Sequence, residues 1–385
     1  MSTATTPITP APAPSDFGPK VLHYWRTLPT LRFLLPAVPA TAVLEAMHAA
    51  PAVIFVTSCL AILALVTLIG KATEEIALYT NPTIGGLLNA TFGNVTELII
   101  AGFALQQGLY GIVKSSIVGS ILGNLLLLLG AAMLIGGLRH PRQTFNSHGS
   151  NASVSMMALS LVAMVIPAII AHGAAFDPDL ADDAVRNRLL GNASIAIAIV
   201  MLVVYFLSLV FQLRTHRSLL APTEHEHAQP QWPRGGAIAA LLGITLIVAW
   251  QSDVFVASLD GMMRAHPIFT PTFMGVIVVA IVGNAAEGSV AIWVARENKM
   301  ELAFQVAMGS SLQVALFVAP VLLLMSYFVG PHPMTLDFSI LETASIWASV
   351  LVASQALSDG ESHWFEGVVF LAVYVIFGVV FFFHP

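Results

Sequence analysis

Long apolar stretches follow one another along almost the whole chain, and each approaches the length that a helix needs to cross a bilayer. About 20 mostly apolar residues span the hydrocarbon core as a helix. Eleven stretches qualify, the first being the weakest: residues 33–48, 51–70, 83–105, 112–136, 152–172, 193–213, 236–257, 270–294, 301–328, 339–357 and 364–383. The predicted fold class is therefore all-α, a polytopic membrane protein with about 11 transmembrane helices.

Composition excludes the soluble alternatives. Only 9% of the 385 residues are charged, whereas soluble domains carry about 25%, so this chain cannot solvate a surface of its size. The single cysteine, Cys59, excludes an internal disulfide and a cysteine-based metal site. The net charge of −6 is mild, and no basic cluster is large enough to bind nucleic acid. Membrane lipid is thus the expected surrounding partner, and a homo-oligomer is left open.

Lysine and arginine residues collect in the loops on one side of the predicted helices, and short loops rich in these residues stay in the cytoplasm. Eleven lie on the side of the N-terminus, and only Arg186, Arg188 and Arg264 lie on the far side. The N-terminus is therefore predicted to be cytoplasmic, in a bacterial inner (plasma) membrane. Residues 1–32 lack the apolar core of a signal peptide and are expected to form a disordered cytoplasmic tail.

A short polar motif occurs twice in the chain. Residues 93–97 read Gly-Asn-Val-Thr-Glu and residues 283–287 read Gly-Asn-Ala-Ala-Glu, and a Gly-Ser pair follows each at 119–120 and 309–310. All these matches share one offset of 190 residues. Because an odd number of helices separates the copies, the second copy would be inverted in the membrane. Secondary transporters recurrently use such inverted repeats, with the substrate site where the two repeats meet.

The repeat predicts how the chain is divided. After the tail come a peripheral first span at 33–50, a first five-helix repeat at 51–213, a cytoplasmic linker at 214–235 and a second five-helix repeat at 236–385.

Two glutamates occupy equivalent positions of the repeat inside apolar segments. A charge in the membrane costs roughly 2.5–3.5 kcal/mol or more and normally marks an ion path or a relay. Neither Glu97 nor Glu287 has a basic residue within one helical turn. Asn94 lies three residues before Glu97 and Asn284 three before Glu287, so each amide shares a helix face with its carboxylate.

The partner segments add further oxygen donors. Ser120 and Asn124 are four residues apart, and Ser310 and Gln313 are three apart. Carboxylates, amides and hydroxyls together suit Ca²⁺, or Mn²⁺, better than a soft metal. The glycines beside them would break the helices or allow close packing, with plain Gly-xxx-Gly packing an equal alternative at 119 and 123; they are Gly93, Gly119, Gly283 and Gly309.

These motifs resemble the signatures of a known family. Residues 82–97 and 113–121 are similar to the first signature of the cation/proton exchangers, the Ca²⁺/H⁺ antiporters of the wider Ca²⁺/cation antiporter group, and residues 283–287 and 309–313 resemble the second. The family usually carries His where this chain has Gly288, and Ser where it has Gly123.

The resemblance implies eleven spans and exchange of Ca²⁺ for protons. By resemblance, Glu97 and Glu287 are the shared cation and proton ligands, and Ser120, Ser310 and Gln313 lie on the helices that close the site. No cofactor is expected beyond the transported Ca²⁺ (or Mn²⁺) and H⁺.

The function predicted is a secondary active antiporter that works by alternating access, with the two glutamates binding metal or protons competitively. A Na⁺- or K⁺-coupled exchanger of the same group and a cation channel are the alternatives. An intramembrane enzyme is excluded, because the histidines fall almost entirely in loops and at span ends.

Each of two further acidic pairs can be interpreted either as a functional element or as part of a solvated loop. Glu74 and Glu75 either form a gating segment, which the resemblance favours, or belong to a solvated loop. Glu224 and Glu226 lie in the short linker and are either a regulatory metal sensor or, as we prefer, part of a solvated loop.

Overall fold

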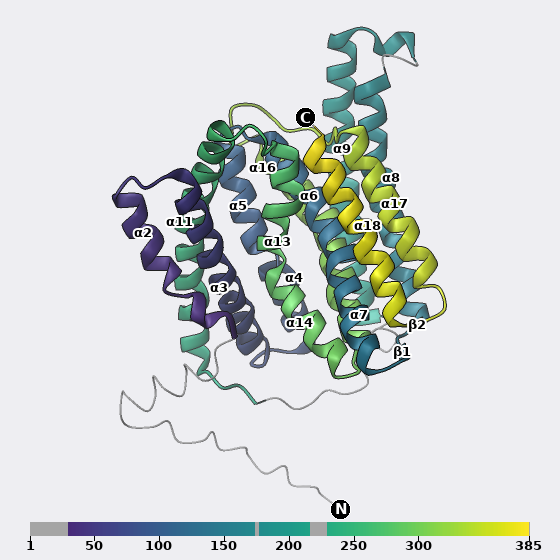
Figure 1. Cartoon of the computed structure of the whole chain (residues 1–385). Coiled ribbons are helices and arrows are strands. Elements are labelled where there is room, and N and C mark those ends of the chain that lie inside the picture. The colour runs from purple at the N-terminus through teal and green to yellow at the C-terminus, as the bar shows by residue number, and fades with distance from the viewer. Residues whose placement is uncertain (1–29, 174–176, 216–228, 385) are drawn as a thin grey trace, which may run out of the picture.

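The computed structural model describes residues 30–173, 177–215 and 229–384, which form a bundle of helices (Figure 1). The tail predicted at 1–32 therefore falls outside the described residues except for its last three, and so do Glu224 and Glu226 of the linker. The first half of the chain contains η1 (Thr30–Leu34), α2 (Ala37–Ala46), α3 (Pro51–Ala77), α4 (Pro82–Phe92), α5 (Val95–Gln106), α6 (Tyr110–Leu122), η2 (Gly123–Leu128), α7 (Leu129–Arg139), α8 (Ser147–His172), η4 (Pro178–Leu180), α9 (Asp183–Val210) and η5 (Phe211–Thr215).

The second half contains α11 (Arg234–Ala265), α12 (Pro271–Phe273), η6 (Met274–Val279), α13 (Ala280–Gly283), α14 (Ala285–Arg296), α15 (Met300–Gln313), η7 (Val314–Val318), α16 (Ala319–Met325), α17 (Ile340–Ala356) and α18 (Trp364–Phe383). The only strands within the described residues are β1 (Gln143–Thr144) and β2 (Glu361–Ser362), which pair antiparallel. This two-residue ladder is a small addition to the predicted all-α fold.

Seven helical segments of the described chain are long and apolar enough to cross a membrane, and a bent pair makes up to eight. The all-α polytopic prediction is therefore confirmed. Helices α5 and α17 are apolar but shorter, at 12 and 17 residues. The predicted first span at 33–48 contains the end of η1 and α2, and α2 has only 10 residues. The α-helix begins only at Ala37, after η1 and Pro36, and it ends at Ala46, before the turn at His48, whose φ is 52°.

The two signature segments are broken helices that begin in the same way. Asn81 accepts a hydrogen bond from the Ile84 amide at 2.8 Å at the start of α4, and Thr270 accepts one from the Phe273 amide at 3.2 Å at the start of α12. A proline follows each cap at the first helical position, where its missing N–H costs nothing. The break after Gly283 bends the second segment by 59°.

The broken segments run in opposite directions. In Figure 1, α4 lies below α5, whereas α13 lies above α14, so the chain ascends through the first segment and descends through the second. We call the lower face, with the α7–α8 and α14–α15 connections, the inner face, because the sequence places these loops in the cytoplasm. The upper face, with the α16–α17 connection, is the outer face.

The two helices that follow the signatures form the centre of the bundle. In the most apolar 18-residue stretch of each helix, 83% of the residues are buried for residues 110–139 and 72% for residues 300–325, against 22% for α18. Each helix changes to π-helix just after its Gly-Ser pair, in η2 and in η7. Single π-turns are rare and occur frequently at functional sites, so their presence at repeat-equivalent positions marks this level of the bundle.

Candidate cation site at the two broken helices

The two glutamates lie in the first turns of helices that start inside the bundle. Asn94 (φ −102°, ψ 12°) and Asn284 (φ −89°, ψ 9°) interrupt the helices, so that α5 and α14 begin directly after them. The amide groups at a helix N-terminus carry a partial positive charge that favours a carboxylate. Each break therefore offers some compensation for placing a glutamate at mid-membrane depth.

Glu97 has no hydrogen-bond partner for either carboxylate oxygen within the described residues, although both oxygens are buried. Its side chain packs against the break of the other repeat: a Cβ added at Gly283 would lie 3.3 Å from Glu97 Cγ and 3.4 Å from Oε1. A side chain at 283 would therefore be tight against Glu97, whose carboxyl group would have to shift by a few tenths of an ångström. Glu97 is left with two acceptor atoms that only a cation, a proton or water can satisfy.

Glu287 is in a similar position on the opposite segment. Its Oε2 is buried without a hydrogen-bond partner in the described part of the chain. The two carboxylates lie within electrostatic range of one another. A pair of acceptors with no internal partner, held near each other in an apolar interior, is suited to share a divalent cation or to take up protons.

Two amide pairs cross from one repeat to the other. Asn94 donates a hydrogen bond through Nδ2 to Gln313 Oε1, and Asn124 donates through Nδ2 to Asn284 Oδ1 at 3.3 Å. Each asparagine at a break is therefore held by an amide from the central helix of the opposite repeat. The structure brings together all four predicted amides, in pairs that their sequence spacing does not show.

Two cavities approach the site from opposite faces. The larger, of about 430 Å³, is lined by residues of α4, the start of α8, the end of α9 with η5 and the length of α15, and it reaches Glu287, Ser310 and Gln313. The smaller, of about 20 Å³, is lined by outer-half residues of α5, α6 and α16 and reaches Glu97, Ser120 and Gly283. We call the larger the inner cavity, because its lining includes Glu301 and Gly149 near the inner face, and the smaller the outer cavity.

The predicted glycines differ in what surrounds them. Gly93 and Gly283 end the helices before the two breaks. Gly119 lies inside α6, where an added Cβ would meet the Val276 carbonyl at 2.2 Å, so it serves close helix packing. Close packing was a wrong prediction for Gly309, because nothing lies within 4 Å of a Cβ added there. Gly309 lines the inner cavity within continuous helix.

Glu74 and Glu75 lie in the last turns of α3 and not in a loop, so the solvated-loop interpretation is wrong about the loop for both and about solvation for Glu75. Glu74 is 64% exposed, whereas the side chain of Glu75 is fully buried. Glu75 pairs with Lys71 at 2.9 Å, and its Oε2 accepts hydrogen bonds from the backbone amides of Gln231 and Trp232 at 2.7 and 3.0 Å. Glu75 thus fastens the end of α3 to the chain that leads into α11.

Sequence reasoning missed a polar stripe on α15. Glu301, Gln305, Gly309 and Gln313 are spaced four residues apart and all line the inner cavity. Glu301 accepts hydrogen bonds from the Asn146 amide and, at 2.7 Å, from Gln305 Nε2. The i, i+4 spacing was visible in the sequence and could have indicated that this face of the helix is wet.

A resident metal centre is not indicated by the residues that the structure describes, since no three His, Cys, Asp or Glu side chains gather there. Two carboxylates with neighbouring amides and hydroxyls form a sparser set of hard oxygen donors.

A family model described as sodium/calcium exchanger protein matches residues 50–214 and 236–383. This chain belongs to the sodium/calcium exchanger family. Within this exchanger family it is 41% identical over 367 residues to the Ca(2+)/H(+) antiporter of Aphanothece halophytica, covering 91% of this chain and 96% of the relative. It is also 41% identical over 357 residues to the Ca(2+)/H(+) antiporter ChaA of Bacillus subtilis (strain 168), covering 91% and 98%.

The solved structure of native YfkE resembles this exchanger with a TM-score of 0.78 at 38% identity, over 92% of this chain and 100% of that chain. The resemblance predicted from the signature motifs is confirmed. As a member of a family of transporters, the chain is an integral membrane transporter and not an enzyme.

Proposed function

We propose that this exchanger moves Ca²⁺ (or Mn²⁺) in one direction and protons in the other, with Glu97 and Glu287 binding either metal or protons. The names of its relatives support this substrate pair, since both are Ca²⁺/H⁺ antiporters. The observation that carries the proposal is the pair of buried carboxylates without internal partners at two crossed helix breaks.

Charge balance explains why such a site would exchange rather than leak. Two deprotonated carboxylates neutralise one divalent cation, and two protonated carboxyls are neutral by themselves. The empty, charged pair is the costly form to carry through an apolar interior. If the site moves between the two faces only when it carries Ca²⁺ or two protons, the fluxes of Ca²⁺ and H⁺ are coupled.

The two cavities support alternating access as the way in which the loaded site changes sides. Glu287 is reached from the inner cavity and Glu97 from the outer one. One substrate would enter the wide inner cavity, bind between the breaks and leave after the inner path closes and the outer one opens. The other substrate would then bind from the outer side and return the site to its first orientation. The opposite directions of the broken segments in Figure 1 fit a movement of this symmetric kind.

Radiolabelled Ca²⁺ uptake by proteoliposomes of the purified protein tests the proposal. Uptake should follow an imposed pH gradient, stop when a protonophore collapses that gradient, and remain unchanged when Na⁺ or K⁺ gradients are imposed. Uptake driven by a Na⁺ or K⁺ gradient at constant pH would replace the proton with that ion. Uptake independent of every gradient would indicate a channel and overturn the antiport mechanism.

A further inference from the structure

The connection between α16 and α17 lies at the outer face (Figure 1), and its part outside any helix or strand, residues 334–339, we call the strap. Met334, Leu336 and Phe338 alternate along it and are at most 2% exposed. Two side-chain hydroxyls hold its backbone, because the Met334 amide donates to Ser326 Oγ at 2.7 Å and the Leu336 amide to Ser194 Oγ at 3.1 Å. The strap is therefore a fixed part of the outer surface.

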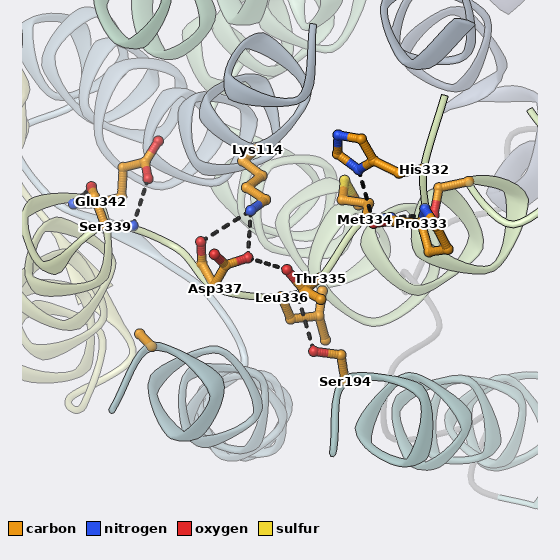
Figure 2. Close-up of polar contacts among 12 residues, drawn as sticks. Lys114, Ser194, His332, Pro333, Met334, Thr335, Leu336, Asp337, Ser339 and Glu342 are labelled. Carbon is orange, nitrogen blue, oxygen red and sulfur yellow. Dashed lines mark hydrogen bonds and ion pairs between the residues drawn. The ribbon is translucent and has the colours of Figure 1, made fainter. Parts of the chain in front are cut away.

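Helix α6 is tied to the strap and to α17 by two consecutive residues. Lys114 Nζ contacts Asp337 Oδ1 at 2.5 Å and the Asp337 carbonyl oxygen at 3.2 Å, as Figure 2 shows. Ser115 Oγ donates to Glu342 Oε1 at 2.6 Å, and this buried glutamate also caps the start of α17. The ion pair is only 18% and 31% exposed, so water screens it less than a surface pair.

The next residues along the same helix line the outer cavity. Ser116 and Ser120, one helical turn apart, border the small space that reaches Glu97. About 20 Å³ holds no more than a water molecule or two, so a cation can pass only if a wall of this cavity moves. Helix α6 is one of those walls, and its outer end is held by Lys114 and Ser115.

The inner end of the repeat-equivalent helix carries different residues at these positions. At the offset of 190 residues, Lys114 corresponds to Phe304 and Ser115 to Gln305. Phe304 stacks on Phe145 with ring centroids 5.3 Å apart, and Gln305 bonds within its own helix to Glu301. The lysine of the outer ion pair therefore has a phenylalanine as its repeat equivalent on the side of the larger cavity.

We propose that the Lys114–Asp337 and Ser115–Glu342 pairs form an outer clamp that keeps the outer path closed and must separate before Glu97 can be reached from outside. The inference rests on alternating access as proposed above. It assigns to Lys114, Asp337 and Glu342 a conformational role: they contact no predicted ligand and act by holding α6.

Thiol accessibility tests the clamp without using transport. In a Cys59→Ala background, Ser116→Cys places a reporter on the wall of the outer cavity, and a membrane-impermeant thiol reagent is applied from the outer side of sealed proteoliposomes. Lys114→Met and Asp337→Asn should each speed labelling by about fivefold or more. Glu342→Gln, which keeps a hydrogen-bonding group, should give a smaller increase.

A charge-swapped variant separates a broken clamp from a damaged fold. Lys114→Asp combined with Asp337→Lys should restore slow labelling, because the pair reforms with its partners exchanged. The matched control is Arg142→Gln, which removes the exposed Arg142–Glu361 pair near the inner face and should leave labelling unchanged. Unchanged labelling in Lys114→Met and Asp337→Asn, with protein that elutes as wild type, would make the pairs a permanent brace and overturn the clamp. Because labelling needs neither Ca²⁺ nor a pH gradient, that result would leave the antiport proposal standing.

Discussion

Helix α6 with η2 and helix α15 with η7 carry the same Gly-Ser pair and the same change to π-helix, yet they line cavities of very different size. The cavity beside α6 is about 20 Å³ and the one beside α15 about 430 Å³. The residues that both helices share place oxygen donors near the two breaks. The outer clamp proposed above assigns to residues in which they differ the role of keeping one side closed.

Equivalent residues of α6 and α15 show this difference in packing. Gly119 of α6 packs directly on Val276, whereas Gly309 of α15 has no neighbour for a side chain to meet. Lys114 is tied to the strap, whereas its equivalent Phe304 only stacks on Phe145. Repeated polar residues within asymmetric packing are what the proposed alternating access predicts for an exchanger resting in one of two orientations.

We expect the largest effect from substitutions of the two glutamates, which occupy equivalent positions in the two signature segments. Glu97→Gln and Glu287→Gln should each reduce Ca²⁺ flux below about a tenth of wild type, a loss of more than ~1.4 kcal/mol. Glutamine keeps the volume but can neither balance the cation nor carry a transported proton. Uptake into proteoliposomes at matched protein content measures this loss.

The control for these variants is Glu297→Gln, because Glu297 is 45% exposed in the α14–α15 connection and pairs only with Lys299. Its flux should equal that of wild type. A Glu97 or Glu287 variant that kept most of its flux would show that the carboxylate is not an essential ligand, and the two sides would then differ in chemistry as well as in packing.

The next effect is the dependence of Ca²⁺ binding on pH. Metal binding requires deprotonated carboxylates, so acid must weaken apparent affinity and alkali must strengthen it, by up to about tenfold per pH unit for each proton displaced. Maximal binding should stay constant, because protons compete for the same site. Equilibrium Ca²⁺ titration of detergent-purified protein from about pH 5.5 to 8.5 measures the slope.

The glutamine variants sharpen this experiment. The residual binding of Glu97→Gln or Glu287→Gln should show a shallower slope, since one exchangeable proton has been removed. Wild-type affinity that does not change with pH would mean that protons travel by a separate route.

Much of this site could be predicted from sequence because the constraint was local and repeated. Two glutamates at one offset inside apolar segments cannot be explained by packing, and the structure places both at helix breaks with buried, unpartnered oxygens. The division of the chain into two repeats stays a prediction. The first span was overestimated, since apolar composition alone did not reveal that the α-helix begins only at Ala37, after a short η1 turn and Pro36.

Other features depend on contacts between distant residues and could not be predicted. The crossed pairs Asn94–Gln313 and Asn124–Asn284 join residues 219 and 160 positions apart. The strap is a short connection without a recognisable sequence motif, and its contact with Lys114 depends on where α6 begins. The buried role of Glu75 likewise depends on backbone amides of residues 231 and 232, far along the chain.

A matched pair of glycine variants tests the difference in packing between α6 and α15, and we expect an effect of intermediate size. Gly119→Ala should destabilise the protein by about 1–3 kcal/mol, because the new methyl group overlaps a backbone carbonyl that cannot simply rotate away. Gly309→Ala should be neutral or slightly stabilising, since it removes a glycine from an uncrowded helix interior. Thermal unfolding in detergent compares the two, and equal melting temperatures would contradict the asymmetric packing.

We expect the smallest effect from substitutions in the crossed amide pairs, because these side chains orient the helix breaks but carry no charge to balance that of the cation. Gln313→Ala and Asn124→Ala should each weaken Ca²⁺ affinity by about 0.5–1.5 kcal/mol, the usual worth of one hydrogen bond. Asn124→Ala should cost less, because its bond to Asn284 at 3.3 Å is the longer of the two. Calcium titration measures both, and a double-mutant cycle of Asn94→Ala with Gln313→Ala isolates the pair. Strictly additive losses would show that the amides bind the cation independently, and the link between the repeats at the breaks would then have to be carried by backbone packing alone.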